Sequence, residues 1–237
     1  MKAVILAGGK GSRLAPYTKV IPKPLMPIGD MPILEVLLHQ IRRAGVDEAI
    51  LSVGHMAILL QAFFQDGNHL GLRIRYSFEK DPLGTAGPLT LVEGLDDTFL
   101  VMNGDVLTTL DFSELISFHK RKKAQVMIAM YDRKVKVDLG VLELDSVGYL
   151  TGYIEKPTFS FQVSMGIYVF EPSVLKSIPM NEHFDFPDLI LRLIEEKQRV
   201  VGFPFAGYWQ DLGRPDDYEQ ATKDFESMRD QFLGDLK

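Results

Sequence analysis

Hydrophobic and polar residues follow two patterns along the first half of the chain. Short apolar runs rich in β-branched residues predict buried strands, and longer segments with apolar residues every three or four positions predict helices. The predicted strands span residues 2–7, 49–53, 72–77, 98–102 and 125–131. The predicted helices span residues 33–43, 55–64 and 113–123, and a further helix is expected after residues 83–88. This alternation indicates parallel βαβ units.

The pattern changes after residue 137 to shorter strands and turns. We predict antiparallel strands at 141–145, 149–154 and 163–170, then a helix at 186–196, a strand at 199–203 and a last helix at 216–232. No linker rich in Pro, Gly or Ser separates the halves, so residues 1–237 are expected to form one domain with two halves, 1–135 and 136–237. The predicted fold is α/β, a Rossmann-like three-layer α/β/α arrangement whose mostly parallel sheet is joined by a smaller antiparallel part.

Composition fits an ordinary globular protein and argues against several functions. Hydrophobic residues make up 46% and charged residues 24% of the 237 residues, which disfavours disorder. The formal net charge of −6 disfavours nucleic acid or an anionic membrane as the partner, because such partners favour a basic surface. No apolar run is long enough to span a membrane, and Met1 leads directly into a strand and not into a signal peptide. We therefore expect a cytoplasmic protein.

Residue types that would support other chemistry are missing from the sequence. The chain has no cysteine, which excludes disulfides, thiolate metal sites and cysteine nucleophiles. Its histidines show no zinc-ligand spacing, and there is no G-x-S-x-G motif. A zinc site and a hydrolase triad are therefore not expected.

A glycine-rich turn after the first strand is the most informative stretch. Gly8, Gly9 and Gly11 remove three side chains in four positions, so backbone N–H groups can come close to a ligand. Lys23 stands between two prolines that stiffen its backbone. The other cations nearby are Lys10, Arg13 and Lys19. Phosphate binding is the favoured interpretation, although neither standard nucleotide-binding glycine signature is present; a structural Gly/Pro turn with solvated lysines is the alternative.

Two further turns follow predicted strands at the edge where α/β proteins bind ligands. Residues 83–88 follow the third strand, although they could equally be a simple helix entry. Asn103-Gly-Asp105 ends the strand 98–102, and although Asn-Gly alone is common in hairpin turns, a carboxylate beside bound phosphates suits Mg²⁺. Asp105 is therefore a candidate metal ligand.

Segments 6–14 and 22–28 together resemble the signature of sugar-1-phosphate nucleotidylyltransferases, the enzymes that make nucleotide sugars. The chain looks most similar to the mannose-1-phosphate guanylyltransferase group, as a catalytic domain alone. The resemblance implies that the first half binds a nucleoside triphosphate, with Arg13 and Lys23 on its phosphates. The implied nucleotide-binding residues are Leu6, Ala7, Gly8, Gly9, Gly11, Ser12, Glu79, Gly84 and Thr85.

The resemblance also implies a metal site and a sugar-phosphate site. A Trp-x-Asp-hydrophobic-Gly motif at 209–213 places a second metal carboxylate at Asp211, so Mg²⁺ is the implied cofactor, held by Asp105 and Asp211. The implied catalytic residues are Arg13, Lys23, Asp105 and Asp211. The implied sugar-phosphate residues, all in the second half, are Gly140, Glu155, Lys156, Ser164 and Gly166.

Two of these positions keep alternatives open. Residues 155–157, Glu-Lys-Pro, would by themselves indicate a surface turn with an exposed ion pair. Ser164 stands where the family often has asparagine, and its single hydroxyl replaces an amide with a donor and an acceptor. This difference leaves the identity of the sugar open.

The activity that the resemblance implies is transfer of a nucleotidyl group from a nucleoside triphosphate to a sugar 1-phosphate, with release of pyrophosphate. GTP with mannose 1-phosphate, or with a similar hexose or heptose 1-phosphate, is the favoured pair. The alternatives are a uridylyl-, thymidylyl- or cytidylyltransferase acting on another phosphorylated acceptor, and a noncatalytic regulatory domain that binds a nucleotide sugar. The expected partners are these small molecules, with neither nucleic acid nor a membrane, and a homodimer is compatible with the sequence.

Overall fold

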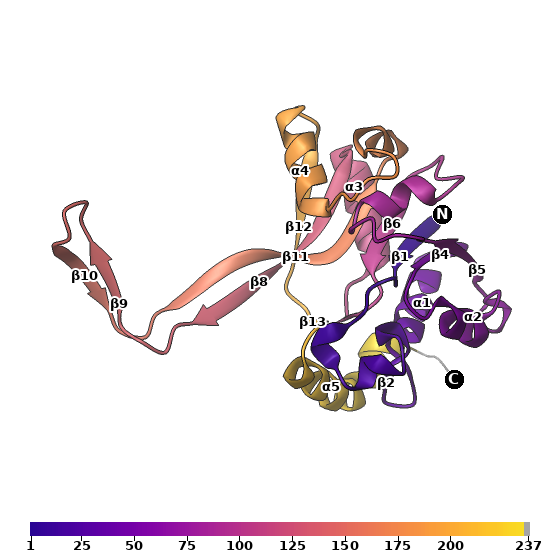
Figure 1. The fold of residues 1–237 in the computed structure, drawn as a ribbon, viewed down its shortest axis with the longest axis horizontal. Coiled ribbons are helices and arrows are strands. Elements are labelled where there is room, and N and C mark those ends of the chain that lie inside the picture. Colours follow the sequence, from indigo (N-terminus) through magenta and orange to yellow (C-terminus); the bar gives the residue numbers. More distant parts are fainter. Residues whose placement is uncertain (235–237) are drawn as a thin grey trace.

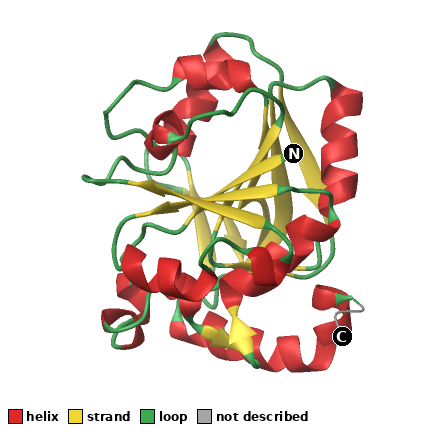
Figure 2. Ribbon diagram, turned by 90° about the vertical axis from the view of Figure 1, so that its right-hand side faces the viewer, coloured by secondary structure: helices red, strands yellow, loops and turns green. Residues whose placement is uncertain are grey.

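The computed structural model describes residues 1–234, and its framework is one seven-stranded sheet with helices on both faces (Figures 1 and 2). Its strands are β1 (Lys2–Leu6), β4 (Glu48–Val53), β5 (Arg73–Phe78), β6 (Phe99–Asn103), β8 (Val126–Lys136), β11 (Thr158–Phe170) and β12 (Val200–Phe205). They lie in the order β12-β8-β11-β6-β1-β4-β5, and β11 alone runs antiparallel to its neighbours. The predicted α/β fold with a mostly parallel sheet is confirmed.

Successive side chains of the central strands are buried on opposite faces of the sheet, as the two-residue period of a strand requires. Ala3 and Ile5 pack with the helices α1 (Ile33–Arg43), α2 (Ala57–Phe64) and α3 (Phe112–Lys122). Val4 faces the other way, toward α4 (Phe186–Glu195). Both faces of β1 are therefore covered, which explains why residues 3–7 form a continuous apolar run.

Short elements surround this framework. Four strands of two or three residues are too short for a periodic signal: β2 (Pro27–Ile28), β3 (Met31–Pro32), β7 (Val106–Thr108) and β13 (Trp209–Asp211). Short 3₁₀ helices form at η1 (Ser12–Leu14), η2 (Tyr17–Lys19), η3 (Lys23–Leu25), η4 (Asn68–Leu70), η5 (Gly87–Leu91) and η6 (Pro172–Ser177). The helix expected after residues 83–88 is only η5, because Pro88 lacks an N–H donor and the chain is extended again by Val92.

The strands β8 and β11 extend far beyond the predicted 125–131 and 163–170. They remain paired, from Phe170 with Val126 to Thr158 with Lys136, and their outer parts project from the body as a long ribbon (Figure 1). At its far end, β9 (Val141–Leu144) and β10 (Leu150–Ile154) form a separate antiparallel pair. We call residues 132–162 the arm. The predicted strand at 163–170 thus joins the large sheet and not a small antiparallel one.

An aromatic contact lies where the arm leaves the body. The ring of Trp209 lies 5.3 Å from the ring of Tyr131, measured between centroids. Its indole Nε1 donates a hydrogen bond of 3.1 Å to the carbonyl of Met165, in the register shift that interrupts the pairing of β11 with β8. The base of the arm is therefore fixed to β13 from one side.

The last helix, α5 (Pro215–Leu233), closes the fold against the N-terminal loop. Leu14, Met26 and Ile28 share a buried cluster with Phe225 and Phe232 of this helix. Gly29 lies against the ring of Phe225 with φ +60°, and a Cβ there would lie 2.8 Å from ring atom Cε1. Although α5 has 19 residues, no helix within residues 1–234 combines the length and apolar character needed to cross a membrane.

A buried carboxylate, that of Glu48, lies at the end of the sheet where the parallel strands begin. The Glu48 side chain at the start of β4 is 5% exposed and accepts hydrogen bonds from Arg73, at 2.5 Å, and from Arg75. Burial alone would raise the pKa of Glu48, but the two guanidinium groups outweigh it and hold this pKa below its ordinary value. Both arginines lie on β5, so this group fastens two neighbouring strands.

Candidate active site

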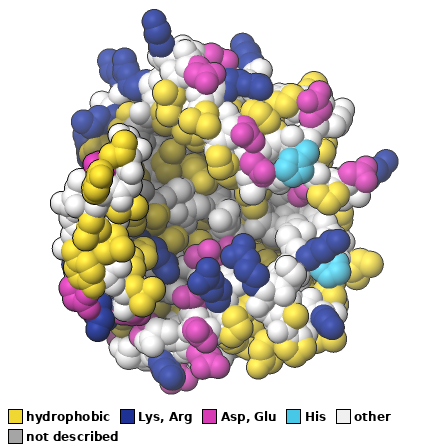
Figure 3. All heavy atoms as spheres, turned by 60° about the vertical axis from the view of Figure 1, so that its left-hand side comes forward, with side chains coloured by type: hydrophobic (Ala, Val, Ile, Leu, Met, Phe, Trp, Pro, Cys, Tyr) yellow, Lys and Arg dark blue, Asp and Glu magenta, His cyan; other side chains and the backbone are white. Residues whose placement is uncertain are grey.

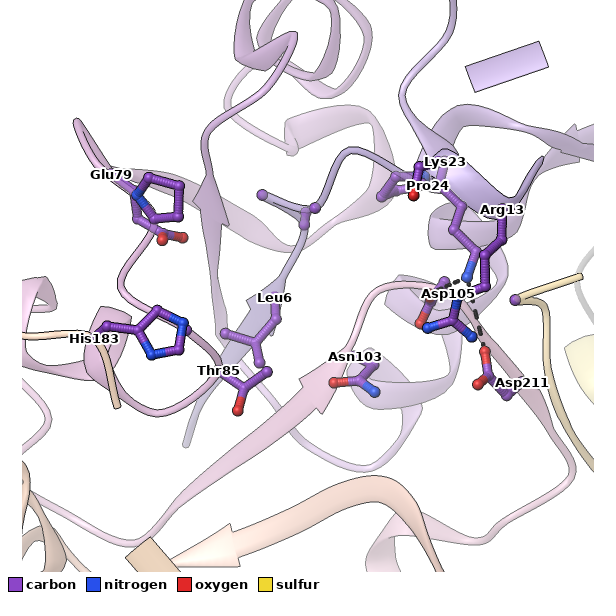
Figure 4. Close-up of a pocket in the computed structure, with 18 residues that line it drawn as sticks. Leu6, Arg13, Lys23, Pro24, Glu79, Thr85, Asn103, Asp105, His183 and Asp211 are labelled. Atoms are coloured by element: carbon purple, nitrogen blue, oxygen red, sulfur yellow. Dashed lines mark hydrogen bonds and ion pairs between the residues drawn. The ribbon is translucent and has the colours of Figure 1, made fainter. Parts of the chain in front are cut away.

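A cavity of about 510 Å³ lies where the parallel strands β1, β4 and β6 end together (Figure 4). Leu6 pairs with Ser52 of β4 and with Asn103 of β6, so three strand ends meet at this edge of the sheet. The residues that line the cavity are Leu6, Ala7, Gly8, Gly9, Gly11, Ser12, Arg13, Lys23, Pro24, Glu79, Pro82, Gly84, Thr85, Asn103, Asp105, His183, Asp211 and Gly213. Such a crevice is the usual ligand site of an open α/β sheet.

The glycine loop forms one wall, and its shape needs glycine at two positions. A Cβ at Gly8 would lie 2.9 Å from Oε1 of Glu79 and 3.3 Å from the amide nitrogen of Gly54. Gly11 is left-handed, with φ +59°, and its carbonyl accepts a 2.8 Å hydrogen bond from the Thr18 hydroxyl. The loop is thus fixed from behind and presents its backbone to the cavity.

Two carboxylates distant in sequence meet at one end of the cavity. The short strands β7 and β13 pair Val106 with Asp211, and the amide of Leu212 donates a 3.1 Å hydrogen bond to the carbonyl of Asp105. Lys23 lies between the two carboxylates: its Nζ donates to Oδ2 of Asp105 and lies 3.7 Å from Oδ1 of Asp211 (Figure 4). The side chain of Arg13 points toward the same group.

Burial and the neighbouring charged side chains both shift the pKa of Asp211. Burial raises the pKa of Asp211 above its ordinary value, and the nearby carboxylate of Asp105 raises it further, while Lys23 and Arg13 act in the opposite direction. Within residues 1–234 no cluster of three or more His, Asp or Glu side chains could hold a metal ion. A divalent cation at Asp105 and Asp211 would therefore need further oxygen ligands from a bound molecule, as Mg²⁺ commonly does in phosphate sites.

The opposite wall is held by a contact between two loops. The carboxylate of Asp185 accepts hydrogen bonds from the amide of Thr85 at 2.8 Å and from its hydroxyl at 3.0 Å. The Thr85 hydroxyl in turn accepts a 2.8 Å hydrogen bond from the amide of Phe186, at the start of α4. Gly84 has φ +80°, and a Cβ there would lie 2.7 Å from the carbonyl of Phe184. These contacts fix the loop that carries Gly84 and Thr85.

Glu79 lies in the cavity on the same side as His183 and Thr85 (Figure 4). Its Oε1 accepts a 3.1 Å hydrogen bond from the Ser52 hydroxyl, and its Oε2 accepts one of 3.3 Å from the amide of Leu83. Glu79 therefore connects the end of β4 to the loop before η5.

The structure brings all the predicted catalytic and nucleotide-binding residues to this one cavity. Sequence reasoning did not assign site roles to five other lining residues: Pro24, Pro82, Asn103, His183 and Gly213. Asn103 ends a strand at the ligand edge and Gly213 ends the motif that holds Asp211, so both had a local signal. His183 had none, because its loop is held at the cavity by hydrogen bonds to a segment far away in the sequence, including Thr85 with Asp185 and the amide of Ala86 with the carbonyl of Phe184.

The predicted sugar-phosphate residues are not among the residues that line the cavity. Ser164 and Gly166 lie beside it on β11, where a Cβ at Gly166 would be 2.5 Å from Nδ2 of Asn103. Gly140, Glu155 and Lys156 lie on the arm. The side chain of Lys156 is 57% exposed, with its Nζ 3.9 Å from Oε1 of Glu155. The roles predicted for these five residues stay predictions.

Comparison with known proteins gives consistent matches. A nucleotidyl transferase family model matches residues 2–228. A UTP–glucose-1-phosphate uridylyltransferase of Synechocystis is 35% identical over 248 residues, covering 94% of this chain and 63% of that relative. A mannose-1-phosphate guanylyltransferase of Mycobacterium tuberculosis is 36% identical over 233 residues, covering 94% of this chain and 64% of that relative. The chain thus spans slightly less than two thirds of these curated relatives.

Solved structures are similar over their whole length. The crystal structure of HddC from Yersinia pseudotuberculosis has 27% sequence identity and a TM-score of 0.73, with 94% of this chain and 99% of that chain covered. A putative glucose-1-phosphate thymidylyltransferase from Bacillus anthracis, at 23% identity, has a TM-score of 0.77 and covers 100% of this chain and 96% of that chain. The latter match supports the fold alone.

Proposed function

Because this chain belongs to the nucleotidyl transferase family, among the sugar-1-phosphate nucleotidylyltransferases, we propose that it joins a nucleoside triphosphate to a sugar 1-phosphate. The observation that carries the proposal is the group of Arg13, Lys23, Asp105 and Asp211 beside the glycine loop, in one cavity at the carboxyl ends of parallel strands. A purely structural Gly/Pro turn would not need two cations and two carboxylates around a cavity.

The reaction is a single displacement. An oxygen of the sugar phosphate attacks the α-phosphorus, a new P–O bond forms, and the bond to the β-phosphate oxygen breaks, so that pyrophosphate leaves with the electron pair. Arg13 and Lys23 neutralise the triphosphate, and the backbone of the glycine loop fixes it beside the second substrate. No covalent intermediate on the protein is needed.

We propose Mg²⁺ as the cofactor, with Asp105 and Asp211 as its protein ligands. The fit rests on the chemistry of the donor set, since two crowded carboxylates, one with a raised pKa, favour a nearby cation. When bound, Mg²⁺ would neutralise charge that develops on the phosphate oxygens. Lys23 lies between the two carboxylates, and its positive charge offsets part of their mutual repulsion.

For the substrates we propose GTP with mannose 1-phosphate or a similar hexose or heptose 1-phosphate. Guanylyltransferase relatives support this choice, as does a structure of HddC complexed with GMP-PN that has 27% sequence identity to this chain. UTP with glucose 1-phosphate is the second candidate, because the uridylyltransferase of Synechocystis is about equally similar.

The test is pyrophosphate release with Mg²⁺ across GTP, UTP, dTTP and CTP, each paired with mannose, glucose and heptose 1-phosphates. One productive pair is expected, and Asp105→Asn should lower its kcat by about 100-fold or more. Asp97→Asn is the matched control, because Asp97 is an exposed aspartate that does not line the cavity. An Asp105→Asn variant with wild-type turnover would refute the metal assignment. If none of these substrate pairs released pyrophosphate, the proposed reaction would be refuted.

A further inference from the structure

The two ends of the cavity differ in chemistry. The predicted catalytic residues gather at one end, where Lys23 is bound to Asp105. Glu79, Thr85 and His183 lie at the other end (Figure 4). In the surface view the molecule is hollowed near its centre, and Lys and Arg side chains gather along the lower border of the hollow (Figure 3). Because phosphates need cations, the triphosphate of a bound nucleotide belongs at the first end and its base at the second.

The base end offers apolar contacts and one carboxylate. Leu6 and Pro82 line the cavity and suit the flat faces of a nucleobase, but contact with a face does not tell one base from another. Glu79 already accepts one hydrogen bond at each carboxylate oxygen, and an ionised carboxylate can only accept. Glu79 can therefore pair with N–H groups of a base, whereas recognition of an acceptor atom needs a donor from another residue.

His183 is fixed at the base end by the backbone of its loop. The amides of Ala86 and Gly87 both donate hydrogen bonds of 2.9 Å to the carbonyl of Phe184. The imidazole itself is less constrained, because its Nδ1 lies 4.0 Å from Oδ2 of Asp185, too far for a hydrogen bond, and its side chain is 63% exposed. A fixed backbone thus carries an imidazole that remains accessible to a ligand.

We propose that His183 selects the base by donating a ring N–H to N7 of guanine, while Glu79 accepts from the N–H groups of the same base. The inference rests on the proposed function, because it assumes that a nucleotide occupies this cavity. Glu79 follows β5 and His183 precedes α4, so the two side chains approach from different elements and can meet different edges of one base.

Guanine is the base that matches this pair of groups. Its N7 and O6 are acceptors on one edge, and its N–H donors lie on another. Adenine also has N7, but an amino donor replaces O6 beside it. Uracil, thymine and cytosine lack the five-membered ring, so they have no atom in the position of N7. The contact from His183 therefore favours a purine, and Glu79 favours guanine among purines.

Calorimetric titration with Mg²⁺ and without a sugar phosphate measures this contact in the absence of turnover. The probes are GTP and 7-deaza-GTP, in which a C–H group replaces N7. Wild type should bind GTP about fivefold more tightly, the net effect of one hydrogen bond. His183→Phe keeps a ring but has no donor, so it should bind both nucleotides equally. His183→Gln, whose amide nitrogen can take the place of Nε2, should restore part of the preference.

His69→Phe is the matched control, because His69 is an exposed histidine that does not line the cavity. This variant should keep the wild-type preference for GTP. Equal binding of the two nucleotides by wild type would overturn the contact, as would an undiminished preference in His183→Phe. A purely structural role for His183 would weaken both nucleotides by the same factor and leave their ratio unchanged.

Titration and pyrophosphate release together separate this inference from the proposed function. A preference that depends on N7, in a protein that turns over no substrate pair, would refute the reaction and leave the base contact in place. Turnover with UTP alone, without measurable GTP binding, would support the reaction and overturn the guanine contact. In a protein active with GTP, His183→Phe should raise KM for GTP about fivefold with little change in kcat, because the contact is made equally before and during the reaction.

Discussion

Replacement of Lys23 by methionine tests how the protein holds two carboxylates together. Methionine keeps the length of the side chain and removes its charge. The Lys23 ammonium is 3.7 Å from Asp211 and closer to Asp105. At an effective dielectric constant near 20, one such attraction amounts to about 4 kcal/mol before desolvation. The Asp211 side chain is 52% exposed, which screens its share. We therefore expect Lys23→Met to lower the free energy of unfolding by about 2–3 kcal/mol in the absence of divalent cations.

The decisive assay is urea unfolding with and without millimolar Mg²⁺. If Mg²⁺ uses the same two carboxylates, it should stabilise Lys23→Met more than wild type, because no ammonium competes with the cation. Addition of Asp211→Asn to Lys23→Met should remove that extra stabilisation. Lys19→Met, at an exposed lysine four residues upstream, should respond to Mg²⁺ as wild type does. Equal stabilisation of Lys23→Met and wild type would refute the idea that lysine and metal share these ligands.

Three further predictions follow from contacts described above. Glu48→Gln should cost about 1–3 kcal/mol at pH 7, because the lowered pKa of Glu48 gives stability that is present above its ordinary pKa. Urea unfolding should show this difference shrinking as pH falls below about 4; a constant difference would contradict the assignment. Asp185→Ala frees Thr85 and should raise KM for the nucleotide about tenfold with little change in kcat, and an equal fall in kcat would contradict a positioning role. Phe225→Ala should lower the free energy of unfolding by about 3–5 kcal/mol, and a loss below about 1 kcal/mol would show that the cluster repacks.

Local sequence patterns predicted most strands of the sheet and the wall of the cavity that the strand ends form. The apolar run before Gly8 and the strand that ends at Asn103 are continuous in sequence, so both the strands and their ligand edge could be inferred. The helix expected after residues 83–88 is only the five-residue 3₁₀ helix η5. The placement of His183 depends on several hydrogen bonds between residues 83–87 and residues 184–186, which no local pattern encodes.

The arm is the feature that sequence patterns described least well. Apolar alternation at 141–145 and 149–154 predicted strands, and β9 and β10 are present. The same alternation normally indicates burial against a core. Here the residues are exposed on a ribbon whose length depends on the register of β8 with β11, and register between distant strands cannot be read from either strand alone.

The single tryptophan of the chain provides a spectroscopic reporter at a useful position. Trp209 contacts Tyr131 where the arm leaves the body, and its indole is hydrogen-bonded to the backbone of β11. Indole emission responds to the polarity around the ring, and energy absorbed by tyrosine transfers to a tryptophan this close. The tryptophan emission of the unlabelled protein therefore reports on the junction between the arm and the body. Stopped-flow mixing with nucleotide, or simple dilution, can follow events at that junction in real time without any added dye.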